Sequence, residues 1–321
     1  MNDEQLESVC LRYPADPPER RLATDLAYGL AGLVLSPAFL LLAAVHGAPG
    51  LAFRRRCAAL AMRQLFSPQR RLPLHDLYKL VVFPMDSVRY FEFQYVWDRV
   101  GTGPVRSYLD VSSPRLLPLL LVRSRPDIEP LLLNPDRADL PVTRQLAEAM
   151  GIDGRCTFSD RVIDEAPIPG GSVELITCVS VLEHIPEDRQ AVRKMWSLLK
   201  PGGRLLLTVP CAAKAAVEYT DRDKYGLLGT DEAGVVFWQR YYDWDLLSER
   251  IFAEIGQPAH FEIYGERVRG VYARNVQEKM STGWRYPGWR EPYLMSRQFH
   301  HFQSLAVLPG MGVIGMEFRK P

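Results

Sequence analysis

Two adjacent side chains with acid–base chemistry, Glu183 and His184, follow the largely apolar stretch 173–180, which has the composition of a buried strand. A carboxylate or an imidazole in such a place can take a proton from an acceptor hydroxyl or amine. Asp243 is a third candidate base. The alternatives are a structural histidine bonded to neighbouring backbone and a solvated carboxylate at a helix start. The sequence leaves these alternatives open.

The elements that must position these side chains alternate between strand-length and helix-length apolar patterns. We expect strands at 107–111, 128–133, 173–180, 204–210, 260–264 and 311–318, and helices at 116–122, 140–150, 189–200 and 246–255. Strands that alternate with helices predict βαβ units and a mostly parallel sheet. The chemistry of such a sheet lies at the carboxyl ends of its strands.

The most specific pattern lies in residues 168–188 and 195–210, with Leu-Glu-His at 182–184 and Leu-Lys-Pro-Gly-Gly at 199–203. It resembles the central part of the class I S-adenosylmethionine-dependent methyltransferases, closely over these stretches and loosely over 105–211. The resemblance implies an α/β fold with a Rossmann-like, seven-stranded, mostly parallel sheet. It also implies an enzyme that uses S-adenosyl-L-methionine to methylate an oxygen or nitrogen of a small-molecule or glycan- or lipid-linked acceptor.

The resemblance further implies a set of cofactor-binding residues at the ends of the first strands. They are Asp110, Ser112, Ser113, Asn134, Asp136, Asp160, Asp164 and Ser180. Asn134 stands where the family has an acid that accepts from both ribose hydroxyls, and Asp136 is the alternative ligand there. Asp160 or Asp164 is the candidate for the adenine amino group.

The loop after the first strand departs from the family, because Ser112, Pro114 and Leu116 replace its three glycines. Serine still permits a close approach of the backbone, whereas Pro114 has no N–H to donate. Two interpretations follow: a divergent but active enzyme, or a membrane-tethered binding module of the same fold that has lost catalysis. The absence of a G-x-G-x-x-G motif after this strand counts against a dinucleotide or nucleotide-sugar enzyme.

The overall charge gives no reason to expect nucleic acid, since 39 Lys and Arg residues face 38 Asp and Glu residues. The five cysteines form no C-x-x-C pair, which argues against a disulfide framework and favours a cytoplasmic location. His300 and His301 lack companion ligands at suitable spacing, so we expect no metal.

Residues 26–53 contain no charged side chain, and Arg20, Arg21 and Arg54–Arg56 flank them. Pro37 predicts a kink or a break of a helix within this stretch, and basic residues on both sides favour a segment that dips into a membrane and returns. A short helix is expected at 57–66. No acid occurs between Leu26 and His75, so residues 26–72 predict peripheral or re-entrant contact with an anionic membrane at its cytoplasmic face. The alternative is a buried helical hairpin.

These patterns divide the chain into two parts. Residues 1–100 are predicted to form an N-terminal helical extension that carries the apolar segment 26–53. Residues 101–321 are predicted to form the methyltransferase-like domain, with an aromatic insert at about 212–305 that binds the acceptor or covers it. Residues 80–84 and 90–97 are interpreted as a segment that connects the two parts.

Overall fold

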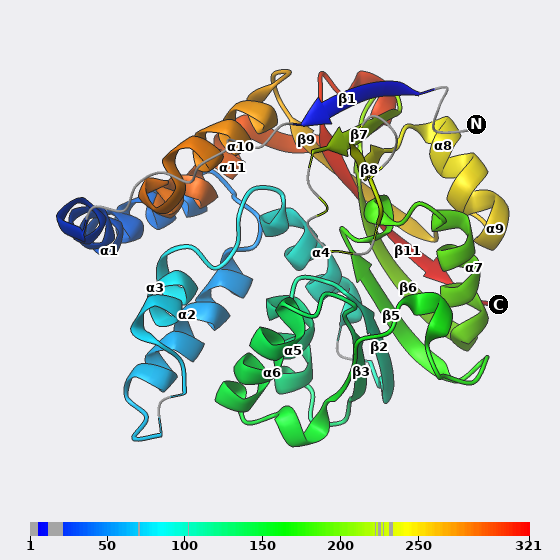
Figure 1. Ribbon diagram of the computed structural model, residues 1–321, viewed down its shortest axis with the longest axis horizontal. Helices are drawn as coiled ribbons and strands as arrows, with labels where there is room; N and C mark the ends of the chain where they lie inside the picture. Colours follow the sequence, from blue (N-terminus) through cyan, green and yellow to red (C-terminus); the bar gives the residue numbers. More distant parts are fainter. Residues whose placement is uncertain are drawn as a thin grey trace.

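The computed structural model describes residues 6–11, 22–69, 71–101, 103–221, 223, 226, 228–230 and 234–321, without the side chains of Leu11, Leu22, Ala23 and Trp284. Arg20 and Arg21, which flank the apolar segment in the sequence, lie outside the described residues. Figure 1 shows a twisted sheet with helices on both of its faces and a group of N-terminal helices on one side.

The main sheet has the order β10-β9-β11-β6-β5-β2-β3-β4 among the described residues. Its strands are β2 (Ser107–Val111), β3 (Glu129–Leu133), β4 (Thr157–Ser159), β5 (Val173–Val179), β6 (Leu199–Cys211), β9 (His260–Glu266), β10 (Phe299–Phe302) and β11 (Gly312–Arg319). Strands β2 to β6 are parallel, and β11 is antiparallel to both β6 and β9. The predicted Rossmann-like sheet is confirmed, but it has an eighth strand because β10 pairs with β9.

The side chains of the central strands alternate between two cores, as expected for strands that are buried on both faces. Leu175 and Val179 of β5 face a core that includes α5 (Leu116–Ser124) and α6 (Asp139–Met150). Ile176 and Cys178 face a second core that includes α7 (Asp188–Leu198). The other helices that cover this second face are α8 (Trp244–Leu247), the π-helical turn η5 (Ser248–Phe252) and α9 (Ala253–Ile255).

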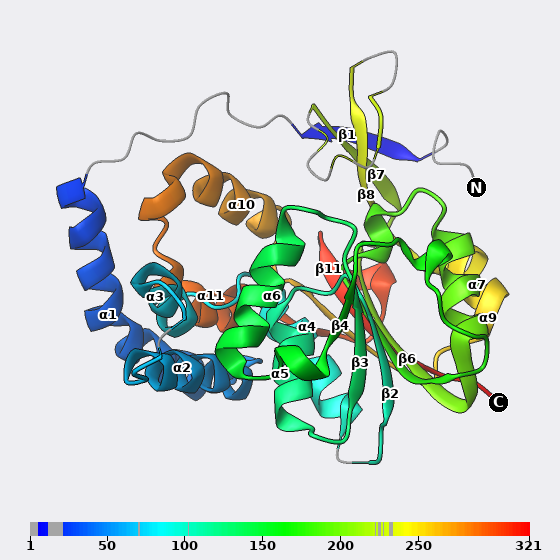
Figure 2. The same ribbon diagram turned by 60° about the horizontal axis from the view of Figure 1, so that its bottom comes forward.

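A small sheet lies beside the main one and has the order β1-β7-β8. Its strands are β1 (Glu7–Leu11), β7 (Ala216–Thr220) and β8 (Val236–Tyr241), with β1 parallel to β7. Figure 2 shows β1 far from helix α1 in space although the two are close in the sequence. The remaining elements are η2 (Asp153–Arg155), η3 (Ile163–Glu165), η4 (Leu182–His184), α10 (Val271–Thr282), η6 (Gly283–Arg285), η7 (Gly288–Arg290), α11 (Glu291–Gln298) and η8 (Leu305–Val307).

The N-terminal region forms helices α1 (Leu22–Val45), α2 (Leu51–Leu65), α3 (Leu74–Val82) and α4 (Arg89–Val100). Of the predicted kink or break at Pro37, the break is wrong, because α1 continues through this residue. The chain reverses at residues 46–50 instead, where Gly47 and Gly50 adopt left-handed backbone conformations. A Cβ at Gly50 would lie 2.4 Å from the carbonyl oxygen of Tyr90.

Residues 80–84 and 90–97, interpreted as a connecting segment that contacts the core, do contact the core, but largely as parts of helices. The first contains the end of α3, and the second lies wholly within α4. Helix α4 buries its aromatic side chains, including Tyr90, Phe91 and Phe93, in the core that α5 and α6 share with the sheet. The aromatic composition of residues 90–97 is compatible with a strand, but packing against the rest of the protein favours a helix here.

Arg54 of α2 joins the N-terminal helices to one another. Its side chain is 2% exposed and donates to Ser36 Oγ of α1 at 3.0 Å and to Tyr90 Oη of α4 at 2.8 Å. It also donates to the carbonyl oxygens of Val81 and Val82 at 3.0 and 2.7 Å. These carbonyls belong to the last turn of α3, where no following helical N–H group donates to them. Arg54 supplies the missing donor.

We predict that Arg54→Met lowers the free energy of unfolding by about 3 kcal/mol, because it leaves buried carbonyl and hydroxyl groups without a donor. Denaturant titration of the full chain measures this loss. Arg55→Met is the matched control, since Arg55 is exposed and its loss should change stability by no more than about 0.5 kcal/mol. Equal stability of the two variants would contradict the role of Arg54.

Candidate active site

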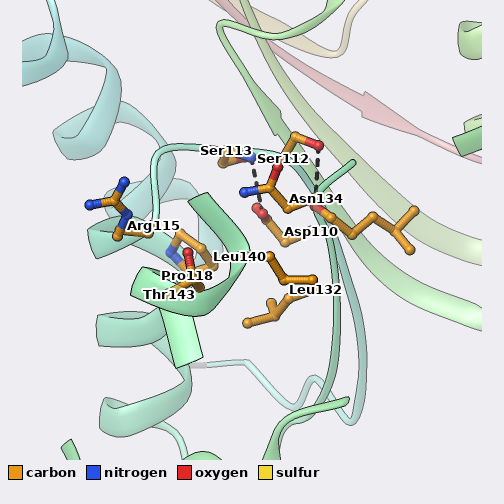
Figure 3. Close-up of a pocket in the computed structure, with 10 residues that line it drawn as sticks. Asp110, Ser112, Ser113, Arg115, Pro118, Leu132, Asn134, Leu140 and Thr143 are labelled. Carbon is orange, nitrogen blue, oxygen red and sulfur yellow. Dashed lines mark hydrogen bonds between the residues drawn. The ribbon is translucent and has the colours of Figure 1, made fainter. Parts of the chain in front are cut away.

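A hollow of about 250 Å³ lies at the carboxyl ends of β2 and β3. Figure 3 shows its lining side chains, which come from these strands, the loop after β2, and helices α5 and α6. Asp110, Ser112, Ser113 and Asn134, all predicted from the sequence, are among them. The structure thus brings half of the predicted cofactor-binding residues together at one place.

Asp110 is the buried carboxylate at the end of β2. It accepts hydrogen bonds from the Thr177 hydroxyl at 2.6 Å and the Ser113 N–H at 3.0 Å. Burial raises the pKa of Asp110 to about 6, although these hydrogen bonds act to lower it. Ser113 Oγ in turn accepts from the Val179 N–H at 3.1 Å. Asp110 and Ser113 therefore join the loop to strand β5.

Ser112 occupies the first of the three glycine positions and keeps the left-handed conformation of a glycine, with φ of 51°. Its N–H and its hydroxyl both donate to the Leu133 carbonyl, at 2.9 and 3.1 Å. These two bonds offset the strain of a non-glycine residue in this region of backbone conformation. The loop after β2 therefore stays close to the end of β3, with a left-handed residue at its first position, without the glycines.

Asn134 at the end of β3 uses both ends of its amide within the protein. Its oxygen accepts from the Asp136 N–H at 3.0 Å, and its nitrogen donates to Asp139 Oδ2 at 2.8 Å. Asp139, in the first turn of α6, also forms an ion pair with Arg115. A carboxylate therefore does lie beside Asn134, but it comes from α6 and not from the end of the strand.

The remaining predicted cofactor residues lie elsewhere. Asp136 accepts from the N–H groups of Ala138 and Asp139 and so begins helix α6. Asp160 is exposed after β4, and Asp164 is half-buried in η3. Neither of them lines the hollow. Ser180 lies at the end of β5, in the second polar region described next.

The second polar region surrounds Glu183, which lies in η4 just beyond β5. Glu183 is buried, and its Oε2 atom has no hydrogen-bond partner among the described residues. The pKa of Glu183 is raised to about 8, mainly by burial; the nearby carboxylate of Glu92 acts in the same direction and Arg89 acts against it. A carboxylate with this pKa can exchange a proton near neutral pH.

Glu92 belongs to α4 and was not predicted from the sequence. It is fully buried and accepts hydrogen bonds from Ser180 Oγ and, at 2.7 Å, from Thr208 Oγ1. Its other oxygen pairs with Arg89 at 2.8 Å. The one sequence signal is that Glu92 is the only acid in the aromatic run 90–97. An isolated acid in such a run indicates a buried carboxylate that needs hydrogen-bond or ion-pair partners.

His184 is held by strand β8 of the small sheet. Its Nδ1 lies 2.6 Å from the carbonyl oxygen of Trp238, so Nδ1 carries the proton and Nε2 is the acceptor in the neutral ring. Nε2 lies 3.9 Å from Glu183 Oε1. Arg240, also in β8, donates to the carbonyls of Ile185 and Pro186 at 2.7 Å. β8 thus fixes His184 and the two residues that follow it.

Asp243, the third candidate base, has a structural role. Its two oxygens accept from the N–H groups of Leu246 and Ala215, at 2.9 and 3.0 Å. The first bond caps helix α8. The structure therefore places Glu183 and His184 side by side. Asp243 is not available as a base, because both of its oxygens accept backbone hydrogen bonds.

Comparison with known proteins gives a match to the family described as a methyltransferase domain, over residues 129–207. The chain is 29% identical over 126 residues to a ubiquinone biosynthesis O-methyltransferase of Xanthomonas euvesicatoria, which covers 39% of this chain and 51% of that protein. It is 33% identical over 73 residues to the enzyme of that name from Pseudomonas paraeruginosa. This match covers 22% of this chain and 30% of that protein. The chain spans about half, or less, of the length of these curated relatives.

Among solved structures, the MccD protein is similar with a TM-score of 0.49 and 10% identity, over 72% of this chain and 96% of that one. A geranyl diphosphate C-methyltransferase from Streptomyces coelicolor has a TM-score of 0.47 and 12% identity, over 80% and 84%. The family match over residues 129–207 confirms the resemblance stated from the sequence, and with it S-adenosyl-L-methionine as the expected cofactor.

The residues around the hollow suit this cofactor. Arg115 lines the hollow, and its Nε atom is buried without a hydrogen-bond partner among the described residues. A carboxylate is the natural acceptor for such a donor, and the amino-acid portion of the cofactor carries one. Asn134 also lines the hollow and is bonded to Asp139, and these are the polar groups that would face the ribose hydroxyls.

We predict that stability falls as pH rises from about 4.5 to about 8 through Glu183. Its carboxyl holds a proton in the folded chain over this range but not in the unfolded chain, so each pH unit costs at most about 1.4 kcal/mol. Glu183→Gln removes this dependence, and denaturant titrations at several pH values measure it. Glu187→Gln, at an exposed neighbour, is the control. A wild-type-minus-variant difference that stays constant with pH would refute the prediction.

We predict that Arg115→Met weakens binding of S-adenosylhomocysteine by roughly 10- to 100-fold, the value of a charge-assisted hydrogen bond. Binding of methylthioadenosine, which lacks the amino-acid portion, should not change. Calorimetric titration of both ligands measures the difference, with Arg137→Met at an exposed position as the control. An equal loss for both ligands would show that Arg115 does not bind the carboxylate.

Proposed function

We propose that this chain, whose residues 129–207 match a methyltransferase domain, is an S-adenosylmethionine-dependent methyltransferase that methylates a hydroxyl oxygen of a small-molecule or glycan- or lipid-linked acceptor. The observation that carries the proposal is the buried, unpartnered Oε2 of Glu183. It lies beyond β5, at the carboxyl edge of the sheet where ligands of open α/β sheets bind.

Each reacting group then has a protein partner of suitable chemistry. The cofactor supplies an electrophilic methyl group on a sulfonium. Arg115, Asn134 and Asp139 hold and orient it at the ends of β2 and β3. Glu183 takes the proton of the acceptor hydroxyl, and the pKa of about 8 makes this carboxyl a better base than an ordinary one. Much of the remaining rate enhancement comes from alignment of the acceptor oxygen with the methyl carbon.

An oxygen acceptor is favoured over a nitrogen acceptor for two reasons. A hydroxyl must lose its proton as the methyl group transfers, and the site provides a base for that proton in Glu183. The curated relatives are also named O-methyltransferases of ubiquinone biosynthesis. Hydroxylated intermediates of ubiquinone biosynthesis are therefore the first acceptors to test, beside hydroxylated glycans.

The second candidate function is a binding module of the same fold without catalysis. The observation in its favour is the ion pair of Arg115 with Asp139 beside a small hollow. Calorimetric titration separates the two functions. Saturable binding of S-adenosylmethionine by the wild-type chain supports the enzyme, and no binding at millimolar concentration supports the module.

We predict that Glu183→Gln lowers kcat for methyl transfer by about 10²- to 10⁴-fold, because the variant cannot accept a proton. The wild-type rate should rise with pH to a plateau above about 8, since only the ionised carboxylate acts as the base. Transfer of a radiolabelled methyl group measures both effects. Glu187→Gln should behave as wild type. If Glu183→Gln keeps both the rate and the pH profile, Glu183 is not the base.

A further inference from the structure

Helix α1 has one face in contact with the protein and one face without a protein partner. Among the helices that the structure describes, α1 is the one long and apolar enough to cross a membrane, and 17% of its most apolar stretch is buried. In both ribbon views it lies at the outer edge of the molecule, on the far side from α7 and α9 (Figures 1 and 2).

The inner face of α1 is fixed along its length. Ser36 accepts from Arg54, Gly32 packs against the Tyr78 hydroxyl, and Ala43 is fully buried. The rings of Tyr28 and Phe39 contact Trp289 and Tyr293 at 6.2 and 5.9 Å between centroids. The helix is therefore held against η7 and α11.

The outer face of α1 is apolar and exposed. Its large side chains are Leu26, Leu30, Leu33, Val34, Leu41 and Val45, of which Val34 and Val45 are 74% and 72% exposed. Met62, Leu65 and Phe66 add further exposed apolar side chains at the end of α2. Apolar surface of this extent marks an interaction site on a folded protein.

The charges of helix α2, which follows α1 in the chain, indicate the kind of partner. Arg55 and Arg63 are exposed on α2, and no acid occurs between Leu26 and His75. Apolar side chains beside arginines match the acyl boundary and the phosphates of an anionic bilayer. A second copy of the chain would instead bring the same positive charges together, which opposes dimerisation through this face.

We propose that α1 lies in the plane of an anionic membrane surface, with the outer face defined above in the headgroup region and Arg55 and Arg63 against lipid phosphates. The helix does not cross the bilayer, because crossing would break the contacts of Ser36 with Arg54 and of the aromatic residues with η7 and α11. This attachment is independent of the methyl-transfer chemistry.

Flotation of the full chain with vesicles tests the proposal. We expect strong binding to vesicles of phosphatidylcholine with phosphatidylglycerol and weak binding to phosphatidylcholine alone. The double variant Leu30→Glu, Val34→Glu should lose binding to both vesicles. The double variant Arg55→Glu, Arg63→Glu should bind the anionic vesicles at least about tenfold more weakly, since each basic residue near the surface is worth about 1 kcal/mol.

Matched controls carry the same changes at exposed sites elsewhere. Val268→Glu introduces an acid at an apolar position, and Arg161→Glu reverses a charge. Both should bind as wild type. Circular dichroism and denaturant titration of all variants identify any that fail to fold, and the single substitution Val34→Glu then replaces the double variant.

The orientation of α1 is tested with fluorophores at Leu30→Cys and Leu41→Cys, three turns apart on the outer face, in a Cys10→Ser background. Lipids that carry quenchers at different depths should give the same depth for both labels, and that depth should be near the headgroups. Unequal depths, with one label near the bilayer centre, would overturn the in-plane orientation. Absence of vesicle binding, or a dimer in light scattering that Val34→Glu dissociates, would overturn the membrane proposal.

Discussion

The buried carboxylate of Glu92 is the constraint on which the candidate site depends. Removing a charge from water costs several kcal/mol unless partners replace the water. Glu92 finds these partners on three elements: Arg89 on its own helix, Ser180 after β5 and Thr208 on β6. Helix α4 is thereby fixed on the carboxyl ends of the two central strands, and any displacement would leave a charge unpaired.

This placement also sets the chemistry of Glu183. The Glu92 carboxylate opposes ionisation of Glu183, and Arg89 favours it. The acidity of the candidate base therefore depends on the N-terminal helices as well as on the sheet. Tyr90, two residues before Glu92, accepts from Arg54, which also bonds Ser36 of α1. Helix α4 thus carries both the tyrosine that bonds Arg54 and the carboxylate that acts on the candidate base.

The sequence predicted most of the sheet and its covering helices, because their apolar residues repeat at clear intervals. In α7, for example, Val192 and Met195 are buried as their spacing requires. It did not predict α4, because the aromatic run 90–97 suits a strand as well as a helix until its neighbours are known. The prediction of a break at Pro37 failed because a proline removes only one backbone hydrogen bond, whereas the contacts of α1 with η7 and α11 persist on both sides of it.

The candidate site was predictable only where one short motif carries it. Glu183 and His184 are adjacent in the sequence, but Glu92 reaches Ser180 across 88 positions, and no local pattern reports that contact.

Arg115 was missed for a different reason. The glycine loop of the family binds through its backbone, so a loop without glycines appears to have lost its function when residue types are compared one by one. In the structure, Ser112 keeps the backbone path, and Arg115 adds a buried donor on the wall of the hollow. The position and burial of this donor depend on the folded loop, so residue types compared one by one do not reveal it.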